Sequence, residues 1–181
     1  MKLFILGVIA TLVVLVGAGL VAIYTGAYNL AADKPHTAIE TSILHTAMTN
    51  SVKSRAAAIV PPADLDAENR SRNGFHLFDE MCVQCHGAPG KKRGEVGMGL
   101  SPEPPDLARV ARRWSTAELF WIVNHGIKAT GMPAFGVTHT DEQLWSIVAF
   151  VEKLPDLTAE QYAAFEHIGG EPHEHEHQHG H

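Results

Sequence analysis

A run of 22 residues without a charged side chain, Leu3 to Tyr24, constrains the fold of this chain more than any other feature. A helix of about 20 apolar residues is long enough to cross the hydrocarbon core of a bilayer. A buried core helix of this length, apolar on every face, would need a larger domain than the rest of a 181-residue chain supplies. The sequence therefore predicts one N-terminal transmembrane anchor within residues 1–26.

The residues around this run predict its orientation. Lys2 precedes it, so by the positive-inside rule the N-terminal end stays in the cytoplasm and the remaining chain is exported. We expect a single-pass protein of the bacterial inner (cytoplasmic) membrane that faces the periplasm or the outside. The alternative is a cleaved signal peptide, since Thr25, Gly26 and Ala27 are small residues near a suitable cut. The run is nevertheless longer than the about 7–15 residues of a typical signal-peptide core.

Residues 27–64 predict a stalk that contains an amphipathic helix. Between Thr37 and Ile59 apolar residues recur every three or four positions, and Pro61 and Pro62 end the pattern. Two uses of this helix stay open at this point. It packs on its own domain, or it lies on the membrane or against a partner subunit.

The sequence pattern of residues 65–157 predicts a small all-α domain. Helix-start signals recur along it, and sustained strand alternation is absent. Asp64 or Asp66 can cap a first helix that runs through Met81. Ser115 with Glu118 opens a second helix through Asn124, and Gly126 stops it. Thr140 with Gln143 opens a third helix. Thr158 with Gln161 repeats the pattern in a short C-terminal helix within residues 158–170. A domain this small and rich in loops needs more than side chains to fill its centre.

The segment Cys82-Val83-Gln84-Cys85-His86 indicates what fills it, because C-x-x-C-H is the signature of covalent haem attachment. Two thiols one helical turn apart can form thioethers with the vinyl groups of a porphyrin, which places His86 as the proximal iron ligand. A thioredoxin-like redox pair normally lies in a βαβ unit, and a zinc site needs two more ligands at matching spacing. The sequence shows neither a βαβ pattern nor a second cysteine pair, so we expect one covalently attached haem c (iron).

Most of residues 65–154 resembles the class I c-type cytochromes. The resemblance rests on Gly74, Phe78 and Cys82 in the pattern G-x-x-x-F-x-x-x-C, on Cys85-His86-Gly87, on Gly131-Met132-Pro133-Ala134-Phe135, and on the segment Leu144–Phe150. It implies that the closing helix crosses the first helix at the glycine and aromatic positions. It also implies that a backbone carbonyl in the loop at residues 100–107 accepts the ring N–H of His86, and that Met132 is the second axial ligand.

Ligand chemistry supports Met132 independently. A thioether is a soft ligand that favours ferrous iron, so a His/Met pair raises the reduction potential and leaves no open coordination position. Met98 is the rival, but it lies between two glycines, whereas Pro133 restricts the chain beside Met132. We interpret His76 and His125 as surface or capping residues.

These features predict an electron carrier rather than an enzyme, with no catalytic residue. We expect redox partner proteins on both sides: a quinol-oxidising complex or dehydrogenase as donor, and a terminal oxidase or reductase as acceptor. Two alternatives stay open, namely a haem subunit of a larger respiratory oxidase or dehydrogenase complex, and a ligand-binding or peroxidatic haem protein with a labile Met132. The chain has 14 basic and 20 acidic residues, so nucleic acid is not an expected partner.

Charge is distributed unevenly along the exported part. Residues 91–113 hold six basic and three acidic side chains, which predicts a positive region that steers an acidic redox partner. Four residues within it are candidates to bind the haem propionates: Arg109, Arg112, Arg113 and Trp114. Residues 171–181 alternate Glu and His, and we interpret them as a disordered tail able to bind divalent metals.

Overall fold

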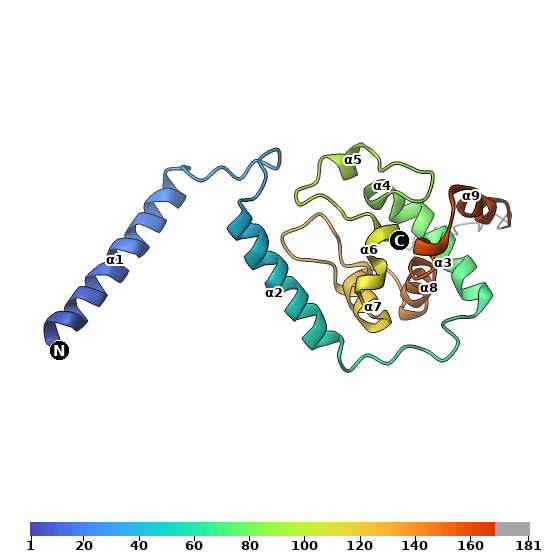
Figure 1. Cartoon of the computed structure of the whole chain (residues 1–181), viewed down its shortest axis with the longest axis horizontal. Helices are drawn as coiled ribbons and strands as arrows, with labels where there is room; N and C mark the ends of the chain where they lie inside the picture. Colours follow the sequence, from blue (N-terminus) through green and yellow to red (C-terminus); the bar gives the residue numbers. More distant parts are fainter. Residues whose placement is uncertain (169–181) are drawn as a thin grey trace, which may run out of the picture. The chain divides into compact units, whose positions relative to one another are not determined.

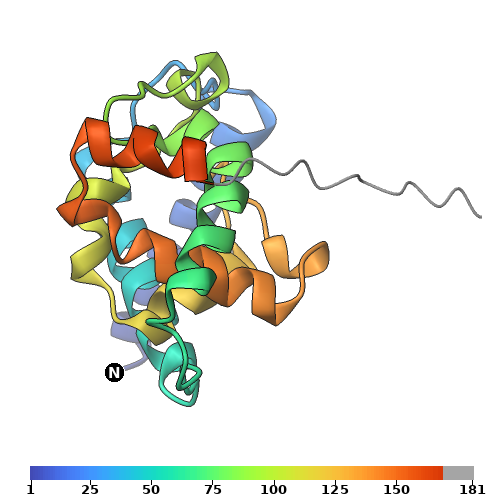
Figure 2. The same cartoon turned by 90° about the vertical axis from the view of Figure 1, so that its right-hand side faces the viewer.

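The computed structural model describes residues 1–168, which are helical apart from the connecting loops (Figures 1 and 2). The predicted all-α class is confirmed, since the described residues contain no strand and one isolated bridge between Ala88 and Lys91. The α-helices are α1 (Lys2–Tyr24), α2 (Ala38–Ala56), α3 (Glu68–Met81), α4 (Val83–His86), α5 (Glu95–Met98), α6 (Leu107–Val110), α7 (Thr116–His125), α8 (Asp141–Val151) and α9 (Ala159–Ile168). The short 3₁₀ turns are η1 (Ala111–Arg113), η2 (Phe135–Val137) and η3 (Leu154–Asp156). The predicted histidine-rich tail lies outside the described residues.

The chain divides into two compact units, residues 1–34 and the part that begins at Pro35. The first unit contains α1, a helix of 23 residues in which no residue is buried. By length and composition α1 can cross a membrane. All the other described helices belong to the second unit.

The starts of three helices follow the predicted capping pattern. Ser115 and Glu118 form a reciprocal capping box at α7, as do Thr140 and Gln143 at α8. At α9 the backbone N–H of Thr158 donates to Gln161, and the N–H of Gln161 donates to the Thr158 hydroxyl.

The predicted cap of α3 is wrong. This helix follows Ala67 and has no side-chain cap. Neither Asp64 nor Asp66 is the cap, and the carboxylate of Asp64 is paired with Arg70 instead. The helix expected over residues 37–59 ends earlier, at Ala56, and the N–H of Ile59 closes a turn on the Ala56 carbonyl.

The crossing of α3 and α8 is the main contact between helices of the second unit (Figure 2). At the crossing, a Cβ added to Gly74 would lie 1.8 Å from the carbonyl oxygen of Ser146. Phe78 and Phe150 pack beside it with ring centroids 5.3 Å apart. The predicted crossing at the glycine and aromatic positions is confirmed, and only glycine allows this closeness.

Replacing Gly74 with Ala should therefore force the two helices apart. We expect the free energy of unfolding to fall by about 3 kcal/mol, as in severe overpacking of a core. Chemical denaturation followed by circular dichroism measures this loss. Asn73→Ala, on the exposed face of the same helix, is the matched control and should leave stability nearly unchanged. Equal stabilities of the two variants would contradict the crossing.

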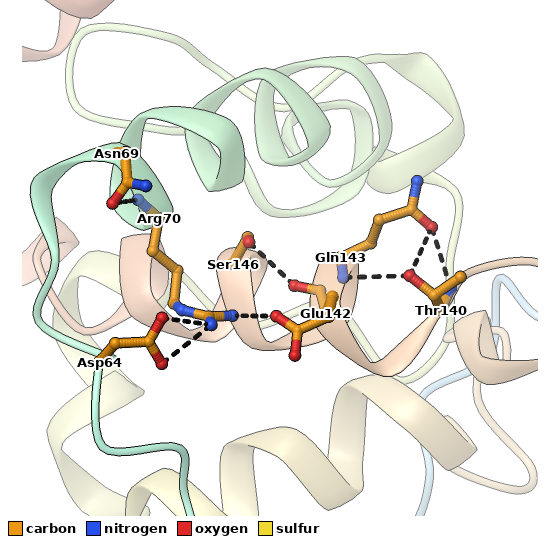
Figure 3. Close-up of polar contacts among 7 residues, drawn as sticks. All are labelled: Asp64, Asn69, Arg70, Thr140, Glu142, Gln143 and Ser146. Carbon is orange, nitrogen blue, oxygen red and sulfur yellow. Dashed lines mark hydrogen bonds and ion pairs between the residues drawn. The ribbon is translucent and has the colours of Figure 1, made fainter.

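Arg70 joins three parts of the chain near this crossing (Figure 3). The side chain is buried, and its guanidinium donates to Asp64 at 2.8 and 3.0 Å and to Glu142 of α8 at 2.8 Å. The hydroxyl of Ser146 donates to the Glu142 carbonyl oxygen. The hydrogen bond from Arg70 lowers the pKa of Asp64 below its ordinary value of 3.8.

Because the pKa of Asp64 is lowered in the folded protein, its contribution to the free energy of unfolding depends on pH. That contribution is fully present above pH 3.8 and is lost as the pH falls through the lowered pKa of the folded protein. We expect Asp64→Asn to be less stable than the wild type at pH 7 and this difference to shrink at lower pH. Denaturation midpoints at pH 7 and well below pH 3.8 test this. A difference that grows on acidification would contradict it.

The stalk helix α2 packs on α7 within the second unit (Figure 1). Val52 and Ala56, in its C-terminal half, are 0% and 2% exposed. Ile39 and Ile43, in its N-terminal half, are 72% and 62% exposed. The C-terminal half of α2 therefore packs on its own domain, which is the first of the two uses that the sequence left open.

Helix α9 adds a buried ring to the same core. Tyr162 is 1% exposed, and its ring lies 5.3 Å from that of Phe75. Its hydroxyl donates to Asp79 of α3 at 2.7 Å, and Lys91 pairs with the same carboxylate oxygen at 2.7 Å. This cluster ties α9 and the loop after His86 to α3.

Candidate functional site

The two cysteines and the histidine of the C-x-x-C-H motif lie where α3 passes into α4. The N–H of Cys82 donates to Phe78 at the end of α3, and the N–H groups of Cys85 and His86 donate to the carbonyl of Cys82. Both thiols are free and half-buried. Burial raises the pKa of Cys82 to about 12, so this thiol is protonated at neutral pH until it reacts.

His86 has the geometry of a metal ligand. Its Nδ1 lies 2.8 Å from the carbonyl oxygen of Pro105, which can only accept, so Nδ1 carries the proton and Nε2 keeps its lone pair. Burial lowers the pKa of His86, which further favours the neutral ring. A carbonyl at the second nitrogen fixes the tautomer and strengthens the ring as a donor to metal. Pro105 thus supplies the carbonyl that the sequence left unidentified.

The loop after the motif folds back on it, which the sequence did not predict. The N–H of Gly94 donates to the carbonyl of Gln84 at 2.9 Å. A Cβ on Gly97 would lie 2.6 Å from that carbonyl oxygen and 2.8 Å from the Cα of Cys85. The glycines at 94 and 97 are the signal that could have indicated this close approach.

The loop that carries Met132 is held by its own hydrogen bonds. The N–H of Met132 donates to the Thr130 hydroxyl at 3.1 Å, and its carbonyl accepts from the N–H of Ile127 at 3.3 Å. Gly126, at φ +63°, ends α7 as predicted, and a Cβ there would lie 2.6 Å from the Met132 carbonyl oxygen. Thr130 was not anticipated from the sequence.

Met132 and the rival Met98 differ in their surroundings. Met132 is half-buried and packs against the main hydrophobic core, as Cys82 does. Met98, in α5, is 67% exposed. One segment also touches both ligand-bearing parts, since Pro105 bonds to His86 and a Cβ on Gly131 would lie 2.5 Å from the Leu100 side chain. These positions favour Met132 as the second ligand.

The residues of this site fit a covalently attached haem. Two free thiols precede a histidine whose Nε2 is available, and a half-buried thioether lies in a loop that shares a supporting segment with it. The donor set of one imidazole and one thioether suits iron in an electron-transfer site.

The arginines suggested for the propionates lie mostly in ion pairs with carboxylates. Arg109 is 84% exposed on its side chain and lies 3.1 Å from Asp106, while Arg112 pairs with Asp156. Trp114 packs against the core. Lys91 and Arg112 pair with Asp79 and Asp156, two acids outside residues 91–113, so most of the basic excess counted over that range is offset in the structure.

Arg93 was missed by the sequence interpretation. Its side chain is only 20% exposed, and its positive charge contributes to the lowered pKa of His86. Arg93 is therefore the basic residue that the structure places in the electrostatic range of the proposed iron ligand.

The other histidines considered from the sequence lie apart from this set. His76 and His125 are exposed, and they contact the rings of Phe75 and Trp121 respectively. Within residues 1–168 no group of three or more His, Cys, Asp or Glu side chains is arranged to hold a metal ion.

The contact of Gly97 with the motif predicts a defect in haem attachment. Gly97→Ala should displace the backbone around Cys85 and reduce the fraction of chains that carry covalent haem roughly several-fold. Haem staining after denaturing electrophoresis measures that fraction. Gly99→Ala is the matched control, because a Cβ there has no neighbour closer than 3.7 Å. Equal staining of both variants would contradict the prediction.

Comparison with known families agrees with the motif. Residues 69–151, from the first turn of α3 to the end of α8, match the family described as cytochrome C oxidase, cbb3-type, subunit III. No curated protein matches the chain. The helical fold, the C-x-x-C-H motif and this match support a domain of the class I c-type cytochrome family over residues 69–151.

Proposed function

We propose that this chain is a membrane-anchored monohaem cytochrome that carries one electron at a time between respiratory donors and acceptors. The family supports haem-based electron transfer as the general activity. The observation that carries the finer proposal is the His86–Pro105 hydrogen bond at the end of α4, which contains Cys85 and directly follows Cys82. This hydrogen bond favours a neutral His86 imidazole close in sequence to Cys82 and Cys85, the two proposed sites of haem attachment.

Each residue of the site has a distinct role in this proposal. Cys82 and Cys85 would hold the haem covalently, and His86 and Met132 would bind its iron. When bound, the haem supplies an iron that accepts and returns one electron. Pro105 keeps the imidazole oriented, and the hydrogen bonds of Thr130 and Ile127 hold the Met132 backbone. A rigid ligand set changes little between oxidation states, which favours electron carriage over substrate chemistry.

Met132→Ala should open the sixth coordination position. We expect the far-red sulfur-to-iron charge-transfer band of the ferric wild type to disappear and the reduction potential to fall by more than about 59 mV, a tenfold change for one electron. Absorption spectroscopy and potentiometry measure both effects. Met98→Ala is the matched control and should behave as the wild type. Loss of the band in Met98→Ala instead would contradict the assignment.

We also propose that α1 is a retained anchor in a bacterial inner membrane, with the haem domain in the periplasm. The helix is long and apolar enough to cross a bilayer, and none of its residues is buried against the rest of the chain. The full chain should resist alkaline extraction from membranes and keep its N-terminal residues, which mass spectrometry measures. A soluble product that lacks about 26 residues, as signal-peptide cleavage would leave, would contradict anchoring.

A second candidate is a haem subunit of a larger respiratory complex. It is favoured by the description of the matching family as subunit III of a cbb3-type oxidase. Purification of the cytochrome from these membranes in a mild detergent distinguishes the two proposed functions. Migration of the cytochrome alone supports the free carrier, and co-purification with an oxidase or dehydrogenase supports the subunit.

A further inference from the structure

The last turn of α7 supports the loop that carries Met132. Gly126 faces the backbone of Met132 and Pro133 so closely that a Cβ would lie 2.6 Å from either carbonyl oxygen. Asn124 lies equally close to the far end of the loop, where a Cβ on Gly136 would be 2.3 Å from its Oδ1. Any displacement of this turn therefore moves the Met132 loop from both ends.

Helix α7 is itself held by two other helices. Phe120 stacks on Trp145 of α8 with ring centroids 3.9 Å apart and an interplanar angle of 15°. Helix α2 packs on α7 (Figure 1). The buried residues of α2 are Val52 and Ala56. Helix α2 lies outside residues 69–151, so this second support comes from a part of the chain beyond the family match.

We propose that α2 is a positioning element for the methionine ligand, acting through α7. Helix α2 packs on α7 and buries Val52 and Ala56, and the C-terminal end of α7 lies against both ends of the Met132 loop. This inference rests on the proposed function, in which Met132 binds the iron. Loops open locally at a lower free-energy cost than the surrounding core, and lost packing beneath a loop lowers that cost further. Weakening the α2 contact should therefore release the Met132 thioether more often.

The test uses the full chain and excess imidazole, which replaces a methionine ligand when the loop opens. The rate of loss of the far-red band in the ferric protein reports that opening. Val52→Ala should raise the rate about tenfold. Ile43→Ala removes apolar carbons from the exposed face of the same helix and should leave the rate unchanged. Leu154→Ala, buried in η3 next to α6 and η1, controls for general loss of stability.

The outcomes separate the two proposals. A wild type without the band overturns the proposed ligation itself. A wild type with the band, and equal rates for Val52→Ala and Ile43→Ala, overturns the role of α2 alone. The role of α2 also fails if Leu154→Ala accelerates displacement as much as Val52→Ala does. If Val52→Ala does not accumulate with haem, Ala56→Gly replaces it, with the same expected acceleration and the same contradicting results.

Discussion

The contact between Gly74 and the carbonyl of Ser146 sets the position of the haem-attachment motif. Helix α3 ends at Met81 and Cys82 follows at once, so the depth and angle of α3 on α8 determine where both thiols lie. Arg70 holds the same two helices through Glu142 and adds the segment before α3 through Asp64. The attachment residues thus take their position from a helix crossing, and any residue larger than glycine at 74 would move them.

A second constraint is the segment of residues 100–107, which contacts both ligand-bearing parts of the chain. Its Pro105 carbonyl orients His86, and its Leu100 side chain lies against Gly131, the residue before Met132. Prolines restrict the backbone of this segment, so it can keep the two parts in a fixed relation. The proposed ligand pair therefore depends on one short loop as well as on the core. In our proposal helix α2, which lies outside residues 69–151, supports the Met132 loop through α7.

Local signals in the sequence predicted much of this arrangement. The capping boxes of α7 and α8 and the stop at Gly126 each depend on residues close in sequence. The crossing at Gly74 was implied by the resemblance, and it agrees with the steric rule for glycine. What could not be predicted involves distant partners. The sequence predicts Asp64 or Asp66 as the cap of α3, but Asp64 pairs with Arg70, which is bonded in turn to Glu142. Such an ion pair leaves no periodic pattern in the sequence.

The same reason explains the residues missed at the site. Pro105 accepts from His86 through a backbone carbonyl, a group that every residue has, so no side chain marks it. Arg93 was one of several basic residues in its stretch, and only the fold distinguishes it from Arg109 and Arg112. The close approach of Gly97 to Cys85 depends on a loop outside the resemblance. In each case the contact depends on how distant parts of the chain pack together, and the spacing of residues along the sequence does not indicate it.

Proton NMR of the reduced protein, with methyl-¹³C methionine, tests the proposed His86 and Met132 ligation most directly. A methionine bound to haem iron lies over the porphyrin ring, whose ring current shifts its methyl resonance far upfield. The account predicts one such resonance, and its disappearance in Met132→Ala but not in Met98→Ala assigns it. An upfield methyl that belongs to Met98, or the absence of any such resonance in the wild type, would contradict the account.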